Sequence, residues 1–219
     1  HIDKKHSFYE ECERLCVSSK MLRNVCLYNI RQFYFEYDKL YFPTVFKKKV
    51  EQEDGSVKVE DKPGNQYVFN YTYLYHLLKD HECFRTETHP ELLFKTNTKV
   101  MKQMFIHVNR EFSSWLMGMK AWGKDPEKFT GKPNMPYYSK KYFQTKFPKE
   151  SISFTKEKGK AVLSMTNIVL DLPDFIGKDN ICEVLISPEG NGFDIITSYK
   201  VNDDVIRSIV KESKNFKFK

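Results

Sequence analysis

The sequence predicts an α+β fold, with a helical lobe followed by a small antiparallel β-sheet or barrel. Two observations lead to this prediction. Apolar residues recur at helical spacing in long stretches of residues 7–123, whereas residues 151–201 form short alternating runs between turn residues. The chain has 219 residues, of which 40% are hydrophobic, so it can bury a substantial core.

The first long helix is predicted over residues 8–37. Ser7 followed by Glu10 is a capping-box pattern, which marks the start of a helix, and Pro43 excludes the helical conformation at the residue before it. We expect one face of this helix to be buried. Its apolar positions are Phe8, Cys12, Leu15, Leu22, Cys26 and Phe33.

Residues 46–65 allow two interpretations. The dipeptide Asp54-Gly55 lies between two charged arms that partly alternate, which is typical of a β-hairpin with a two-residue turn. A solvated loop fits the same residues equally well, because almost nothing in this segment could be buried on either face.

Two further helices complete the predicted helical lobe. Asn70 or Thr72 can cap a short helix, and Thr96 or Asn97 opens a long helix that runs to about Trp122 and stops at Gly123. After Gly123 the helical period gives way to turns and alternation. We therefore place the boundary of the helical lobe at residue 123.

Residues 124–150 predict an extended basic and aromatic strap. Residues 124–149 hold seven lysines against two acidic residues, and four prolines interrupt any regular structure. The interspersed aromatic residues are Phe129, Tyr137, Tyr138, Tyr142, Phe143 and Phe147.

Five short strands are predicted within residues 151–201, separated by glycine, proline and asparagine. We expect neighbouring strands to pair as hairpins in an antiparallel sheet or barrel. Residues 202–219 are expected to form a linker that could start as a helix. The strand candidates are Ser151–Thr155, Ala161–Met165, Ile168–Leu172, Ile181–Ser187 and Phe193–Val201.

The charge balance suits a polyanionic partner. The formal net charge is +7, and the basic residues of the strap alternate with aromatic rings that can stack on bases. In the first helix, Lys20 and Arg31 project within about 20° of each other and Arg23 lies about a sixth of a turn away, which predicts a basic stripe. A protein-interaction scaffold with a packed aromatic strap is the alternative interpretation.

The sequence offers no catalytic constellation. It contains no glycine-rich phosphate loop and no metal-ligating His or Cys motif, so we expect neither a catalytic residue nor a metal ligand. Asp203 and Asp204 could bind a metal ion, but a solvated turn is the favoured explanation for adjacent acids after a strand. An enzyme with an unrecognised site is therefore only a third interpretation.

Cysteine usage and hydropathy predict a soluble cytoplasmic protein. The five cysteines form no Cys-x-x-Cys pair, which is typical of reduced core thiols in a cytosolic protein. No apolar run approaches the roughly 20 residues that a membrane-spanning helix requires.

Several motifs occur in an order that resembles one known family. They are SKMLRNVCLYNIRQ at residues 19–32, FSSW at residues 112–115, PEKFTGKPNMPYYSK at residues 126–140 and IVLDLP at residues 168–173, with Tyr199 in the last strand. Together they resemble the N-terminal half of TnpB proteins, the transposon-associated RNA-guided DNA endonucleases once called OrfB transposases. These are related to the miniature type V CRISPR effectors, and the resemblance covers nearly all of residues 7–201.

The resemblance implies a recognition lobe of helices, inserted in or attached to a wedge-type β-barrel. Guide RNA and double-stranded target DNA would be the partners, and the helices would also read a short DNA motif beside the target. DNA contacts would fall on Asn70, Thr72, Thr98, Lys99, Lys102 and Gln103. RNA contacts would fall on Lys20, Arg23, Arg31, Lys132, Tyr137, Tyr138, Lys140, Lys141 and Lys146.

Two departures from the family pattern shape the functional expectation. The first barrel strand is missing or reduced to residues 1–5, and the RuvC nuclease domain, where Mg²⁺ would bind, is absent up to Lys219. The resemblance therefore implies a fragment or a natural truncation that binds nucleic acid in the prokaryotic cytosol, near the nucleoid, without a cofactor and without cleaving DNA itself.

Overall fold

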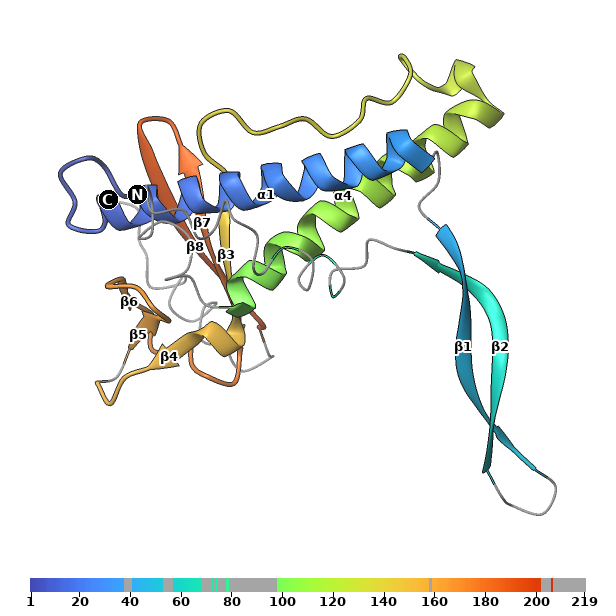
Figure 1. Ribbon diagram of the computed structural model, residues 1–219. Helices are drawn as coiled ribbons and strands as arrows, with labels where there is room; N and C mark the ends of the chain where they lie inside the picture. The colour runs from blue at the N-terminus through green and yellow to red at the C-terminus, as the bar shows by residue number, and fades with distance from the viewer. Residues whose placement is uncertain are drawn as a thin grey trace. The chain divides into compact units, whose positions relative to one another are not determined.

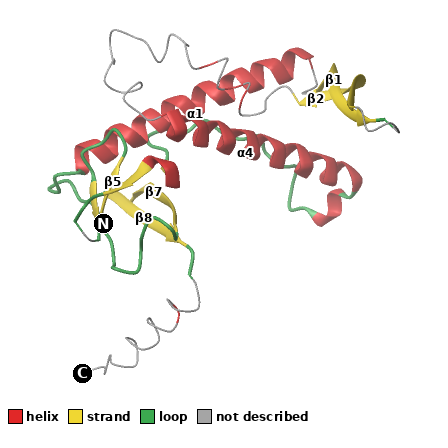
Figure 2. Ribbon diagram, turned by 90° about the horizontal axis from the view of Figure 1, so that it is seen from below, coloured by secondary structure: helices red, strands yellow, loops and turns green. Residues whose placement is uncertain are grey.

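The computed structural model describes residues 1–37, 41–52, 57–67, 98–157 and 159–201, together with Thr72, Leu74, Leu78 and Ile206. It is a mixed α+β structure with two long helices and short antiparallel strands (Figures 1 and 2). The predicted fold class is therefore confirmed at this level. The predicted linker over residues 202–219, apart from Ile206, lies outside the described residues.

Helix α1 spans Tyr9–Tyr37, close to the predicted bounds. The backbone nitrogen of Phe8 donates to His6 Nδ1 at 3.1 Å, and that of Tyr9 donates to the His6 carbonyl at 3.0 Å. His6 rather than Ser7 therefore provides these hydrogen bonds at the start of the helix. The predicted apolar face is largely buried, with Cys12, Leu15 and Cys26 at 0–1% exposure.

Helix α4 spans Thr98–Lys124, so it continues one residue beyond the predicted stop at Gly123. Four of its buried residues recur every four positions, which is the spacing of one helix face, and Met101 and Phe105 widen that face. The four are Val100, Met104, Val108 and Phe112. Of the short helix predicted after Asn70, the structure describes Thr72, Leu74 and Leu78 as helical, and both leucines are fully buried.

Strands β1 (Tyr41–Glu51) and β2 (Val57–Tyr67) pair antiparallel in a separate two-stranded ribbon (Figure 1). The register runs from Tyr41 opposite Tyr67 to Glu51 opposite Val57. The hairpin interpretation of this segment is therefore confirmed over the loop interpretation, and its strands begin and end beyond the predicted 46–65. The predicted turn dipeptide itself lies outside the described residues.

All five predicted strands are present, but they do not form one barrel. Strands β4 (Ile152–Phe154), β5 (Lys160–Leu163) and β6 (Val169–Asp171) make one three-stranded antiparallel sheet. Strands β7 (Ile181–Glu189) and β8 (Gly192–Tyr199) pair with β3 (Thr145–Pro148) in a second sheet, in the order β3-β7-β8. Among the described residues the two sheets stay separate, so a closed barrel is not formed.

Strand β3 and two short 3-10 helices correct the prediction of a fully extended strap. The 3-10 helices are η2 (Pro126–Lys128) and η3 (Lys149–Ser151). In β3 the burial alternates, with Thr145 at 1% and Phe147 at 0% exposure while Lys146 and Pro148 are half-buried. This period of two is typical of a strand with one buried face. The end of the strap is thus part of a sheet.

The chain divides into two compact units. The first comprises His1–Arg23, His81–Met104 and Tyr138–Lys219, and the second comprises Asn24–Asp80 and Phe105–Tyr137. Each long helix contributes residues to both units.

The first unit holds a continuous apolar core in which both three-stranded sheets and the start of α1 take part. Phe147 and Phe193 are its largest fully buried side chains, and burying each contributes roughly 1.5–3 kcal/mol. Ile2 pairs with Phe193 through hydrogen bonds of 2.7 and 3.0 Å. Gly192 permits this approach, because a Cβ there would lie 2.3 Å from the Ile2 carbonyl oxygen.

Among its described residues, the second unit combines the later part of α1 with most of α4. The Tyr34 ring meets those of Phe112 and Trp115 edge-on, with centroids 6.0 and 5.3 Å apart. Edge-to-face pairs of this kind add to the stabilisation from burial. The fully buried side chains of this unit are Cys26, Leu27, Ile30, Leu74, Leu78, Phe105, Val108 and Phe112.

Candidate nucleic-acid interface

The part of the strap between η2 and β3 contains no helix or strand. In the second unit it contacts α4, where Trp115 Nε1 donates to the Pro133 carbonyl at 3.2 Å. A Cβ at Gly118 would lie 3.6 Å from the Pro133 side chain, so the proline ring sits close against the helix. The segment is therefore held in place by contacts to α4 instead of by regular secondary structure.

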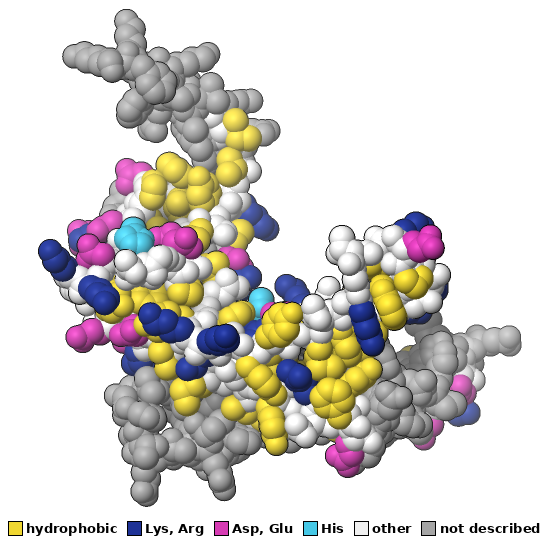
Figure 3. Space-filling view, turned by 90° about the horizontal axis from the view of Figure 1, so that it is seen from above, with side chains coloured by type: hydrophobic (Ala, Val, Ile, Leu, Met, Phe, Trp, Pro, Cys, Tyr) yellow, Lys and Arg dark blue, Asp and Glu magenta, His cyan; other side chains and the backbone are white. Residues whose placement is uncertain are grey.

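The same segment exposes cations and aromatic faces in the second unit. Lys132 Nζ lies 5.7 Å from the centre of the Trp122 ring, Tyr137 is 69% exposed and Phe129 is 36% exposed. Met117 of α4 is also 67% exposed. On the face shown in Figure 3, cationic side chains lie among hydrophobic ones. Surfaces of this kind bind single-stranded nucleic acids, because the bases stack on exposed aromatic rings and the phosphates form ion pairs with lysines.

In the first unit the strap continues with Tyr138, Lys140 and Lys141 exposed. Lys141 Nζ lies 4.9 Å from the centre of the Tyr142 ring. The Tyr142 hydroxyl donates a hydrogen bond to Glu13, which together with burial raises the pKa of Tyr142 well above its ordinary value. Tyr142 therefore remains a neutral hydrogen-bond donor.

Arg23, a predicted RNA contact, is buried inside the first unit. It is 5% exposed, its Nη1 donates to Ser139 Oγ at 3.0 Å, and its guanidinium lies 4.7 Å from the centre of the Phe143 ring. In this structure its guanidinium group is occupied by contacts within the first unit. Of the three residues in the predicted basic stripe of the first helix, Arg23 is therefore the buried one.

The other predicted RNA contacts outside the irregular segment are half-buried. Lys20 and Arg31 are in this class, and Lys146 forms an ion pair of 2.6 Å with Glu183 across β3 and β7. The exposed members of the predicted RNA contacts are therefore in the strap, with Lys132 and Tyr137 in the second unit and Tyr138, Lys140 and Lys141 in the first.

The predicted DNA contacts fall into two groups. Thr98 and Lys99 are exposed at the start of α4, while Lys102 and Gln103 are half-buried on the next turn. Lys99 Nζ also donates to the Glu150 carbonyl at 3.4 Å. Elsewhere, Thr72 is exposed and Asn70 lies outside the described residues.

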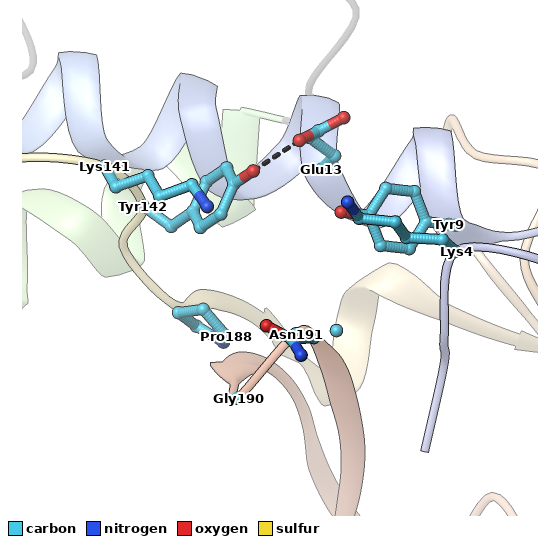
Figure 4. Close-up of a pocket in the computed structure, with 9 residues that line it drawn as sticks. Lys4, Tyr9, Glu13, Lys141, Tyr142, Pro188, Gly190 and Asn191 are labelled. Carbon is cyan, nitrogen blue, oxygen red and sulfur yellow. Dashed lines mark hydrogen bonds between the residues drawn. The ribbon is translucent and has the colours of Figure 1, made fainter.

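The structure also contains a pocket that the sequence prediction missed, with a volume of about 460 Å³ (Figure 4). Four separate segments of the first unit supply its wall, so no local motif could have revealed it. They are the N-terminal segment, the first turns of α1, the strap and the β7–β8 turn. The lining residues are Lys4, Tyr9, Glu13, Lys141, Tyr142, Pro188, Gly190, Asn191 and Gly192.

The described cysteines are free thiols, with Cys12, Cys16 and Cys26 buried and Cys182 half-buried. Burial raises the pKa of Cys12 to about 11 and that of Cys16 to about 12. Cys83 lies outside the described residues, as do Asp203 and Asp204. Within the described ranges, no group of three or more His, Cys, Asp or Glu residues is placed to hold a metal ion.

A search of the helices for membrane spans gave no candidate: neither α1 nor α4, nor any other described helix, is long and apolar enough to cross a membrane.

Comparisons with known proteins identify no relative. No protein-family model matches the chain, no curated protein matches it, and no solved structure matches it.

Proposed function

We propose that this chain is the nucleic-acid-binding module of a TnpB-like RNA-guided DNA endonuclease. In this proposal the helices serve as a recognition lobe and the two sheets as a wedge-type lobe, working together in the prokaryotic cytosol. The module binds guide RNA and target DNA, and the start of α4 reads a short DNA motif. Guide pairing supplies sequence specificity, while the protein grips the backbone. We propose no cleavage step for this chain.

The observation that carries the proposal is the exposed surface of the irregular strap. Lys132 lies over Trp122, Tyr137 is 69% exposed, and Lys140 and Lys141 are exposed as well. A packed scaffold would bury rings such as those of Tyr137 and Tyr138, because each aromatic side chain contributes much of its stabilisation through burial. Their exposure on a segment that also exposes lysines favours a ligand that has both phosphates and bases.

The physical basis of binding would be counterion release together with stacking. Each phosphate contact steepens the dependence of log affinity on log salt concentration by about 0.7 to 0.9 units, and each stacked base adds roughly 1–3 kcal/mol. Since the surface combines cations with rings, both effects should be measurable on the same protein.

The test is a titration of the chain against a structured RNA and a DNA duplex of equal length, at several salt concentrations. We expect binding with a steep salt slope. The triple variant Lys132→Ala, Lys140→Ala and Lys141→Ala should reduce the size of that slope by about two to three units. The matched control replaces three exposed lysines outside the strap: Lys156, Lys178 and Lys200.

Each outcome of this titration bears on the proposal. A slope that flattens in the strap variant and not in the control supports it. Equal flattening in both variants shows only a general effect of charge and contradicts the assignment to the strap. If neither nucleic acid binds near physiological salt, the scaffold interpretation replaces the proposal.

A further inference from the structure

The pocket of the first unit combines two aromatic rings with groups that both donate and accept hydrogen bonds (Figure 4). Tyr9 and Tyr142 lie on one side, and both rings pack against Phe193 at centroid distances of 5.3 and 5.4 Å. Phe193 is fully buried, so it supports both tyrosines from the core. The rings are therefore fixed platforms for a flat ligand.

Glu13 gives the pocket a hydrogen-bond acceptor that is already oriented. The Tyr142 hydroxyl donates to one of its oxygens, as Figure 4 shows. A carboxylate has two oxygens and about four acceptor positions, so Glu13 keeps most of its capacity for a ligand. A ligand that binds this carboxylate must place N–H or O–H donors against it and keep its own acceptor atoms away from it.

Asn191 and two lysines add donors at the same pocket. Gly190 has φ +55° and opens the two-residue turn between β7 and β8, as the first central residue of a type II′ turn does, and Asn191 follows it as an exposed residue. Lys4 and Lys141 line the pocket as well, and both are exposed. A ligand that fits all three features has a flat ring, a row of donors beside an acceptor, and a negative group outside the ring.

Guanine nucleotides have this set of groups. The Watson–Crick edge of guanine places two neighbouring N–H donors, N1–H and the N2 amino group, beside the O6 acceptor. Adenine has one amino donor next to the N1 acceptor, and uracil has one N–H between two carbonyl oxygens, so both set an acceptor against the carboxylate. Single-stranded RNA is commonly read by stacking a base on an aromatic ring and bonding its Watson–Crick edge.

We propose that this pocket receives one guanine nucleotide of a single-stranded RNA segment. Glu13 accepts from the two N–H donors, Asn191 donates to O6, the tyrosine rings stack on the base, and Lys4 and Lys141 contact the flanking phosphates. A volume of about 460 Å³ lies within the range of small-ligand sites. This inference rests on the proposed function, since it names one nucleotide within the RNA that the module binds.

The test compares two single-stranded RNA decamers, one of uridine alone and one with a single central guanosine, by fluorescence anisotropy with the full chain. We expect the guanosine decamer to bind about tenfold more tightly. Replacing that guanosine by inosine removes the N2 amino group and should give an intermediate affinity. Replacing it by adenosine should return the affinity to that of the uridine decamer.

Glu13→Gln should reduce the preference to about twofold or less, because an amide oxygen cannot accept both donors without its own N–H groups opposing one of them. Glu10→Gln is the matched control, since it makes the same charge change on an exposed residue of the same helix. Asn191→Ala, in an exposed turn, should reduce the preference about threefold. It tests the pocket even where loss of the Tyr142 hydrogen bond prevents Glu13→Gln from folding.

The ratio of the two affinities separates the two proposals. If both decamers bind equally, this inference is overturned while the proposed function stands. If neither binds, both fail. A guanosine preference that survives Glu13→Gln and Asn191→Ala places recognition elsewhere and overturns the pocket assignment.

Discussion

The two parts of the strap share a composition of lysine, aromatic residues and proline, yet they have different structures. Residues 129–144 contain no helix or strand and leave Tyr137 69% exposed, whereas Thr145–Pro148 forms β3 and buries Phe147 completely. The difference follows from the order of the residues. Thr145 and Phe147 alternate with Lys146 and Pro148, while Tyr137 and Tyr138 are adjacent, so they cannot lie on one face of a strand.

Composition alone therefore does not separate an exposed irregular segment from a strand that is part of the core. Pro148, at the end of β3, pairs only with Glu183 of β7, and β3 is an edge strand, which is where a sheet tolerates proline. Three measurements test this contrast between the buried and the exposed part of the strap.

The largest expected effect is at Phe147. Phe147→Ala should lower the free energy of unfolding by about 3–5 kcal/mol, because it removes a fully buried ring from the core of the first unit. Urea unfolding followed by circular dichroism measures it. Phe147→Leu, which keeps most of the volume, should cost clearly less. An unchanged midpoint for Phe147→Ala would mean that β3 is not docked as described.

An intermediate effect is expected from pH, through Cys16 beneath the end of the strap. Thr145 Oγ1 lies 4.0 Å from Cys16 Sγ, and burial raises the pKa of this thiol from 9.0 to about 12. Above pH 9 the unfolded chain loses the thiol proton while the folded protein keeps it, so stability falls as pH rises. The fall should be about 1.4 kcal/mol per pH unit for this thiol, between pH 9 and 12.

The measurement is urea unfolding of the wild type and of Cys16→Ala at pH 8, 9 and 10. The difference between the two proteins isolates this thiol from the other groups that titrate in the same range. We expect the wild type to lose stability more steeply than the variant above pH 9. Parallel curves would show that the thiol is as accessible in the folded protein as in the unfolded chain.

The smallest effect on stability is expected at Tyr137. Because its ring is 69% exposed, Tyr137→Ala should change the free energy of unfolding by no more than about 0.5 kcal/mol. Affinity for the RNA decamers should nevertheless weaken by roughly 1–3 kcal/mol through the lost stacking. Tyr28→Ala, which removes a ring that is 55% exposed on α1, serves as the control and should leave RNA affinity unchanged.

The elements that could be predicted from sequence are those with a local signal. The period of α1, the prolines and glycines between the strands, and the turn at Gly190 are all visible in neighbouring residues. Strand β3 was missed because its four residues lie among lysines and prolines that also fit an extended loop. The arrangement of the strands in two sheets depends on which strand pairs with β7. That pairing joins residues far apart in the sequence, so no pattern of neighbouring residues indicates it.

The candidate site divides in the same way. The exposed lysines and tyrosines of the strap follow from its composition, whereas the burial of Arg23 depends on Ser139 and Phe143, more than 100 residues later in the chain. Glu13 gave no signal in the sequence, since a carboxylate on the first turns of a helix is usually solvated. Only the folded chain brings it to Tyr142 and the β7–β8 turn.

The contacts of the irregular strap with α4 have a spectroscopic consequence. The chain contains two tryptophans, and each meets this segment: Trp115 donates its indole hydrogen to the Pro133 carbonyl, and Trp122 lies beneath the Lys132 ammonium group. The intrinsic tryptophan emission of the protein therefore comes entirely from the helix beside the exposed strap. A ligand that displaces the lysine or stacks nearby changes the emission of an unlabelled protein, while events confined to the sheets leave it unaltered.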